Sequence, residues 1–180
     1  MCPDMIRDGT GKGYLAQVTE NNKLRGYATC ESEISYESEV NERAYTWTYA
    51  YNYTGADTIL WLRNDSTTLN LIIDRILIAS DTATRVILHF PANLAPSGTV
   101  VRGINLNRKS NLVADASCYG NEINNVQANI FANALIPANV PAILPAEGSI
   151  VLGYLDCVAI DFVTTGTLGM VTFRAYYHDV

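Results

Sequence analysis

Few side chains in this sequence could act as a catalytic base or nucleophile. The chain has 180 residues but only 2 histidines, His89 and His178. Catalysis of the Ser–His–Asp type holds a histidine beside the hydroxyl that it activates. His89 lies inside an apolar segment and His178 follows an aromatic one, and the sequence contains no Gly-x-Ser-x-Gly motif. We therefore expect both histidines to be structural.

Paired carboxylates offer a second route to hydrolysis, because a glycosidase places two of them across its cleft. Asp74, Asp156 and Asp161 lie in or beside expected strands, but their spacing selects no pair. The glycine-rich segment 9–13 departs from the spacing of a phosphate-binding loop, and no His, Cys or acidic residues show metal-ligand spacing. The sequence thus predicts no catalytic residue, no metal and no cofactor, and we expect the protein not to be an enzyme.

The four cysteines, Cys2, Cys30, Cys118 and Cys157, stand at wide and irregular intervals. They form no Cys-x-x-Cys pair, and the sequence opens without the apolar stretch of a secretory signal. Because disulfides are typical of secreted proteins, we expect free thiols, with Cys157 in the hydrophobic core.

The overall charge argues against some classes of partner. Acidic residues number 18 and Lys plus Arg number 12, which gives a formal net charge of −6. Nucleic acids and anionic membranes attract basic proteins. No apolar run approaches the roughly 18 residues that indicate a membrane-spanning helix. We therefore expect neither nucleic acid nor a membrane as the partner.

Alternation of side-chain type gives the clearest structural signal. From Tyr45 to Thr54 every odd position is aromatic and every even position is small or polar, and this period of two predicts a β-strand. Further strands are expected at residues 58–64, 69–79, 84–90, 99–106, 113–119, 149–160 and 170–178. About eight strands separated by turns predict an all-β protein, a β-sandwich of the jelly-roll type.

Two segments leave alternatives open. Residues 69–79 are apolar at odd and even positions, which predicts a strand buried on both faces, either centrally or against a neighbouring subunit. Asp74 and Arg75 interrupt this run and need partners or access to water. Residues 121–136 carry apolar side chains at helical spacing, but five asparagines weaken a helical assignment. The prolines of residues 137–145 then predict an irregular loop.

The chain is expected to divide into an N-terminal arm, residues 1–44, and a jelly-roll body, residues 45–180. A glycine-rich turn in the arm precedes a short hairpin formed by residues 13–18 and 24–30. An acidic linker over residues 31–44 follows, whose few apolar side chains cannot form a core alone.

The aromatic face of residues 45–53 has two interpretations. Five aromatic side chains in a row are poorly tolerated in water without a partner, so the face is expected in the core or at a subunit interface. If it were exposed, the same side chains would suit binding of a sugar or a protein.

Four passages of the sequence carry a resemblance. They are residues 7–18 (RDGTGKGYLAQV) with 22–24 (NKL), 103–107 (GINLN) with Ser110, 144–150 (LPAEGSI) and 173–178 (FRAYYH). Together they resemble tailed-bacteriophage virion structural proteins of the capsid decoration or cement type. The chain departs from that family in its proline-rich loop at residues 136–147 and in its four cysteines.

The resemblance implies a homotrimeric jelly roll that binds the shell of the major capsid protein and stabilises the head. The implied location is the capsid surface of a virion assembled in the host cytoplasm, and no catalytic residue carries over. An arm that orders on the shell would place partner contacts in both parts of the chain. The expected partner-binding residues are Arg7, Asp8, Lys12, Tyr14, Leu15, Trp47, Tyr49 and Tyr51.

Two other functions are consistent with the same strand pattern. A tail- or fibre-associated β-sandwich module that recognises host surface glycans would expose an aromatic strip with Trp47, Tyr49 and Tyr51. A sugar-cleaving sandwich enzyme would need two carboxylates in one cleft.

Overall fold

The computed structural model divides the chain into two compact units, Met1–Ser32 and Glu33–Val180. The residues that it describes are 5–7, 15–18, 24–25, 32–53, 57–92, 97–122, 129–146, 149–164, 166 and 168–179. The boundary between the two parts thus falls after residue 32, whereas the sequence placed it after residue 44.

The first unit contains a small antiparallel sheet. Its strands β1 (Met5–Arg7), β2 (Leu15–Val18) and β3 (Leu24–Arg25) lie in the order β1-β2-β3. Val18 pairs with Leu24 across β2 and β3, which confirms the pairing expected for a hairpin here.

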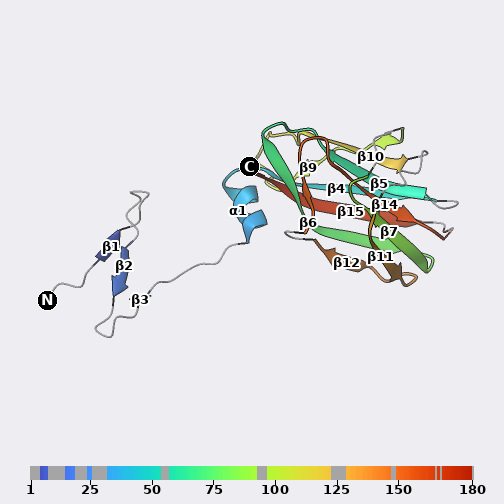
Figure 1. Ribbon diagram of the computed structural model, residues 1–180, viewed down its shortest axis with the longest axis horizontal. Coiled ribbons are helices and arrows are strands. Elements are labelled where there is room, and N and C mark those ends of the chain that lie inside the picture. Colours follow the sequence, from blue (N-terminus) through green and yellow to red (C-terminus); the bar gives the residue numbers. More distant parts are fainter. Residues whose placement is uncertain are drawn as a thin grey trace. The chain divides into compact units, whose positions relative to one another are not determined.

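The second unit is a sandwich of two antiparallel sheets (Figure 1). Sheet one contains β4 (Ala44–Tyr51), β6 (Leu69–Ser80), β9 (Ile104–Asn105), β12 (Ala142–Pro145), β13 (Val151–Leu152) and β15 (Gly169–Asp179). Sheet two contains β5 (Asp57–Asn64), β7 (Thr84–His89), β8 (Thr99–Val100), β10 (Ala116–Glu122), β11 (Ile130–Ile136) and β14 (Cys157–Phe162). The expectation of an all-β sandwich is confirmed.

The chain crosses repeatedly from one sheet to the other. Sheet one has the order β12-β6-β15-β4-β9, with β13 beside β6, and sheet two the order β11-β7-β14-β5-β10-β8. From β4 to β7 each successive strand changes sheet, and β12, β14 and β15 alternate in the same way after β11. First and last strands of the sandwich, β4 and β15, therefore lie side by side in the middle of sheet one.

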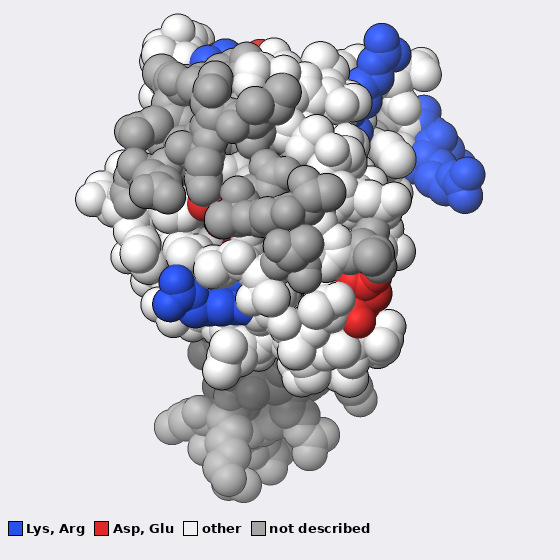
Figure 2. Space-filling model, turned by 90° about the vertical axis from the view of Figure 1, so that its right-hand side faces the viewer, with Lys and Arg blue, Asp and Glu red and all other residues white. Residues whose placement is uncertain are grey.

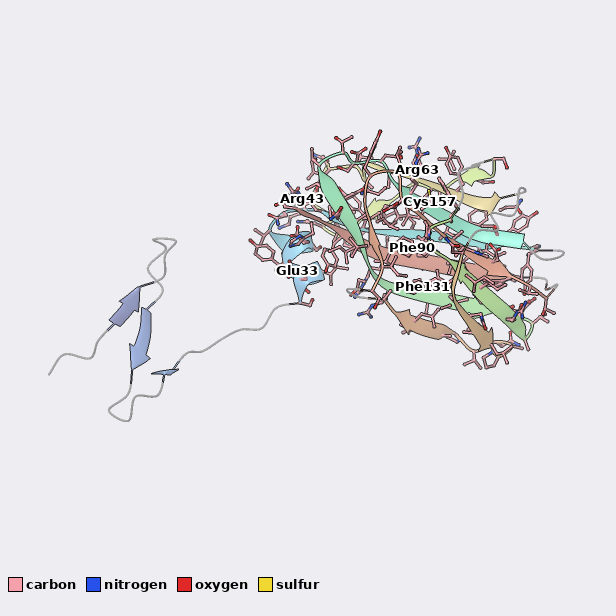
Figure 3. The ribbon with its side chains drawn as sticks, in the orientation of Figure 1. Glu33, Arg43, Arg63, Phe90, Phe131 and Cys157 are labelled. Carbon is pink, nitrogen blue, oxygen red and sulfur yellow. The ribbon has the colours of Figure 1, made fainter. Side chains whose placement is uncertain are left out.

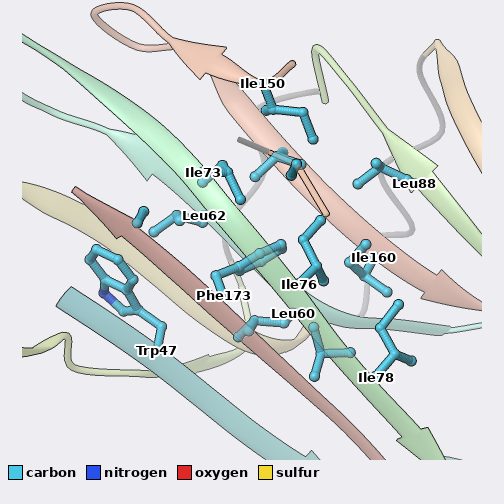
Figure 4. Packing of buried hydrophobic residues seen from close by; sticks show 14 of the residues in the cluster. Trp47, Leu60, Leu62, Ile73, Ile76, Ile78, Leu88, Ile150, Ile160 and Phe173 are labelled. Atoms are coloured by element: carbon cyan, nitrogen blue, oxygen red, sulfur yellow. The ribbon is translucent and has the colours of Figure 1, made fainter. Parts of the chain in front are cut away.

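The aromatic face of β4 lies in the core between the sheets. Tyr45 and Trp47 are 2% and 1% exposed, whereas Thr48 and Ala50 on the other face point to solvent. Figure 4 shows Trp47 among aliphatic side chains of both sheets, including Leu60, Leu62, Ile73, Ile76, Ile78, Leu88, Ile150, Ile160 and Phe173. The interpretation of this face as a core face is confirmed.

A β-bulge at Asp74 explains why β6 is apolar at both odd and even positions. On β15, Arg174 pairs with Arg75, but Ala175 pairs with Ile73, so Asp74 is an extra residue in β6. The core-facing side chains are therefore odd-numbered up to Ile73 and even-numbered from Ile76 onward. The predicted burial of both faces was wrong in this respect, because a shift of parity within one core face produces the same pattern.

The segment expected to be an acidic linker contains a helix that packs on the sandwich. In α1 (Glu33–Glu39), Ile34 is 6% exposed and contacts Ala44 and Tyr176 in a small cluster. The carbonyl of Arg43 accepts a hydrogen bond of 3.0 Å from the backbone N–H of Tyr177. Few apolar side chains suffice here, because the sandwich supplies the rest of the contact surface.

Three expected elements differ from the structure. Residues 130–136 form strand β11 and not a helix, since Ala134 and Ile136 turn inward at a period of two. The expected strands 99–106 and 149–160 are each broken into two short pieces, β8 with β9 and β13 with β14, whose members lie in different sheets. The expected loop 137–145 includes strand β12.

Candidate functional site

The residues expected to contact a partner lie in different environments. Arg7 lies in β1 and Leu15 in β2, while Asp8, Lys12 and Tyr14 lie outside the described residues. The described aromatic residues are Trp47, which is buried, and Tyr49 and Tyr51, which are half-buried and stack with ring centroids 6.1 Å apart. Trp47 therefore has no surface to offer a glycan or a protein, and the structure brings together no exposed aromatic strip with Trp47 in it.

A buried polar cluster joins sheet two on its outer face. Thr58 on β5 donates a hydrogen bond of 2.7 Å to Oδ1 of Asp161 on β14, and Nε2 of His89 on β7 lies 2.8 Å from Oδ2 of the same carboxylate. All three residues are at most 3% exposed. Burial raises the pKa of Asp161, and the Thr58 hydroxyl and the His89 imidazole partly offset that rise.

This cluster does not have the order of a nucleophilic triad. The hydroxyl of Thr58 bonds to the carboxylate, whereas a nucleophile would bond to the imidazole that activates it. Each oxygen of Asp161 instead meets one neighbouring strand, so the cluster links β5, β14 and β7. Its geometry suits cohesion of sheet two, which agrees with a structural role for His89.

The carboxylate of Asp74 is neutralised on the outside of sheet one. Oδ2 of Asp74 accepts hydrogen bonds from Nε of Arg174 at 2.6 Å and from Nε of Arg75 at 2.9 Å. Asp74 is 5% exposed, but both arginines keep part of their side chains in water. The bulge thus turns a polar residue of a core strand toward two cations, which meets the requirement of the sequence for a partner.

The three carboxylates considered for glycoside hydrolysis are dispersed. Asp156 accepts a hydrogen bond of 3.0 Å from the backbone N–H of Gly153, while Asp74 and Asp161 have the partners given above. The printed hydrogen bonds of these three aspartates share no partner. Across the described ranges, no group of three His, Cys, Asp or Glu side chains could hold a metal ion. No helix within those ranges is long and apolar enough to cross a membrane.

The two cysteines that the structure describes are free and buried. Burial raises the pKa of Cys157 to about 12 and that of Cys118 well above its usual value. Figure 3 shows Cys157 within the sandwich. The expectation of free thiols is confirmed for these two, including the buried position of Cys157, while Cys2 and Cys30 lie outside the described residues.

An apolar, uncharged edge is the most distinctive surface of the sandwich. We define the β11 edge as the strand β11 with the adjoining turn and β12. Five large apolar side chains are exposed there, namely Ile130 (59%), Phe131 (48%), Leu135 (81%), Val140 (51%) and Ile143 (58%). Residues 123–146 contain no Asp, Glu, Lys, Arg or His. Figure 2 shows the end of the sandwich at the right of Figure 1, where charged side chains are few and lie apart.

The opposite edge of the sandwich is shorter and carries charge. Strands β8 and β9 have two residues each, and a pocket of about 360 Å³ beside β8 and β10 includes Arg102 in its lining. The connection that follows β9 carries the exposed cations Arg108 and Lys109. The two edges therefore differ in length and in charge.

The predicted site residues did not include the β11 edge. The helical interpretation of residues 121–136 concealed its exposed strand, and the absence of charge from residues 123–146 was the signal that could have identified it. No family model, no curated protein and no solved structure matches the chain. The function is therefore argued from the residues and their geometry.

Proposed function

We propose that this protein is a virion structural protein, a cement or decoration subunit that binds the major capsid protein on the capsid surface. The observation that carries the proposal is the connectivity of the sandwich. Strands β4, β15, β6 and β12 form one sheet and β5, β14, β7 and β11 the core of the other, with crossovers between them. This order supports assignment as a jelly roll, an architecture found in viral capsid proteins.

The polar chemistry of the described residues is consistent with a scaffold. Asp161 links three strands and Asp74 binds two arginines, so both carboxylates are engaged in stabilising sheets. A cement subunit works by burying contact area between neighbours, which needs a rigid body and complementary surfaces. The sandwich supplies such a body, and the sequence resemblance supplies the capsid shell as the partner.

The first unit has a separate part in this proposal. It has its own three-stranded sheet, and it includes Arg7 and Leu15 from the motif that resembles the family's opening. In the proposed assembly this unit contacts an adjacent capsid subunit, while homotrimerisation multiplies individually weak contacts. The implied setting is a virion assembled in the host cytoplasm.

A glycan-binding module is the competing proposal, because jelly rolls also occur in lectins. Its strongest sequence argument was an aromatic strip, and Trp47 at 1% exposed has no ring surface for stacking. Tyr49 and Tyr51 are the described remainder of that strip, and they pack partly against the core.

The proposal is tested by adding the full chain to purified shells of the major capsid protein. We expect saturable binding at a fixed copy number, and electron microscopy should place the added density on the outer surface. Deletion of residues 1–20 should abolish binding while circular dichroism still reports a folded sandwich. Absence of binding by the full chain would contradict the function, and undiminished binding by the truncated chain would contradict the role of the first unit. Binding to a glycan array would favour the competing module.

A further inference from the structure

Strand β11 ends sheet two with one side of its backbone unpaired among the described strands. It pairs with β7 alone, and Ala132 to Ile136 match Leu88 to Thr84 in unbroken register. A register shift between Ile130 and Ala132 confines the irregularity to the start of the strand. An unpaired edge of this length presents backbone donors and acceptors that another strand can satisfy.

The usual means of protecting an edge strand are lacking along most of β11. Lysines, other charges and prolines commonly block such edges. The sequence of β11 is IFANALI, which contains none of them. The other long-edge candidate, β12, has four residues and ends in Pro145 with Pro141 just before it, while β8 and β9 have two residues each. Among the described edges, β11 is therefore the one suited to strand pairing.

The sequence of β11 is nearly the same in both directions. Around Asn133 stand an alanine on each side, then Phe131 and Leu135, then an isoleucine on each side. Antiparallel pairing with a second β11 centred on Asn133 would set alanine against alanine and Phe131 against Leu135. Since the pairing is twofold symmetric, the apolar Phe131–Leu135 contact would form twice, as in an isologous interface.

The exposed side chains are placed for that contact. Ala134 and Ile136 turn toward the core, so Phe131, Asn133 and Leu135 lie along the outer face of sheet two. Phe131 is held by an edge-to-face contact with Phe90, with ring centroids 6.0 Å apart (Figure 3). Leu135 is 81% exposed, and pairing would cover it with an aromatic ring.

We propose that two copies of this chain associate through β11, pairing antiparallel about a twofold axis at Asn133 so that sheet two continues from one copy into the other. A second copy is favoured over an unrelated partner because the strand is complementary to itself and the surface carries no charge to select an opposite one. The contact does not depend on shell binding. If the protein also forms threefold trimers, the β11 contact joins two of them into a hexamer.

The test is the mass of the full chain in solution, measured by sedimentation equilibrium over a range of concentrations. We expect an even number of copies. Asn133→Lys places two like charges directly opposite each other at the axis, and should reduce the mass of the assembly to half. Leu135→Lys, at a highly exposed position, should do the same and serves if Asn133→Lys does not fold.

Matched controls separate pairing from a general effect of charge. Asn111→Lys makes the same exchange at an exposed position before β10, four strands away in sheet two, and should leave the mass unchanged. Asn133→Asp alone should halve the mass, but an equal mixture of Asn133→Asp and Asn133→Lys should restore it, because only a twofold contact sets residue 133 against itself. A monomer, an odd number of copies, an Asn133→Lys variant of full mass or a mixture without recovery would overturn the proposal.

Discussion

Nε of Arg174 on β15 lies 2.6 Å from Oδ2 of Asp74, the extra residue of the bulge in β6. The pair joins two neighbouring strands of sheet one at the point where the core-facing side chains of β6 change parity. Because Asp74 is 5% exposed and also binds Arg75, its carboxylate exchanges water for two guanidinium groups.

Separate removal of either partner should destabilise the fold. We expect Asp74→Asn and Arg174→Met each to lower the free energy of unfolding by about 1–3 kcal/mol, with the arginine contribution reduced by its solvent exposure. The double variant should lose less than the sum, and urea unfolding of all four proteins measures this coupling. Arg108→Met, at an exposed loop position, should change stability by about 0.5 kcal/mol or less. Strict additivity would show that the two side chains do not interact.

Gly120 on β10 faces the ring of Tyr49 on β4, across the two sheets. A Cβ at Gly120 would collide with ring atoms of Tyr49, so Gly120→Ala should lower the free energy of unfolding by about 1–3 kcal/mol through overpacking. At Gly153 an added Cβ would come 3.2 Å from a carboxylate oxygen of Asp156, which can move aside. Gly153→Ala is therefore the control, and equal losses of stability by the two variants would contradict the packing argument.

The raised pKa of Asp161 predicts a dependence of stability on pH. The folded state holds the proton more tightly than the unfolded state, whose aspartate has the usual pKa of about 3.8. The resulting stabilisation is present below that pH and is lost as pH rises through the raised pKa of the folded state. Asp161→Asn keeps an acceptor for Thr58 but removes the titration. The wild type minus variant difference in unfolding free energy should therefore decrease from acidic to neutral pH, and a constant difference would contradict the shift.

Burial of Cys118 and Cys157 predicts slow alkylation in the native protein. The thiolate is the reactive form, and burial raises the pKa of both thiols. Iodoacetamide at neutral pH should leave the peptides containing these two residues unmodified, as read by mass spectrometry, until urea unfolds the protein. Rapid modification of either thiol without unfolding would show that the sandwich opens locally.

The sequence predicted those parts of the fold in which side-chain alternation is uninterrupted. Tyr45 to Tyr53 marked β4 and its core face, and the expected strands at residues 58–64, 84–90 and 170–178 agree closely with β5, β7 and β15. Alternation works there because one face of each pattern lies against the core.

Interruptions of a strand were harder to predict. The bulge at Asp74 changes parity within β6, and a count of apolar residues cannot distinguish this change from burial on both faces. Residues 99–106 and 149–160 pass from one sheet to the other, which depends on contacts distant in sequence, such as the ring of Trp47 over Gly103.

Prediction of the candidate site depended on exposure, which a single sequence does not specify. Tyr45 and Trp47 are of residue types common at binding surfaces, yet the opposite sheet buries them. Conversely, the apolar residues of β11 suit a core by composition, and only their place at the end of sheet two exposes Leu135.

The position of β4 beside β15 has a consequence for the covalent order of the chain. Arg43 forms an ion pair of 3.2 Å with Asp179, so the second unit begins and ends at one place. A short peptide bridge between these ends, with new termini opened in the exposed loop at Arg108 and Lys109, would give a circular permutant that keeps every strand pair of the sandwich.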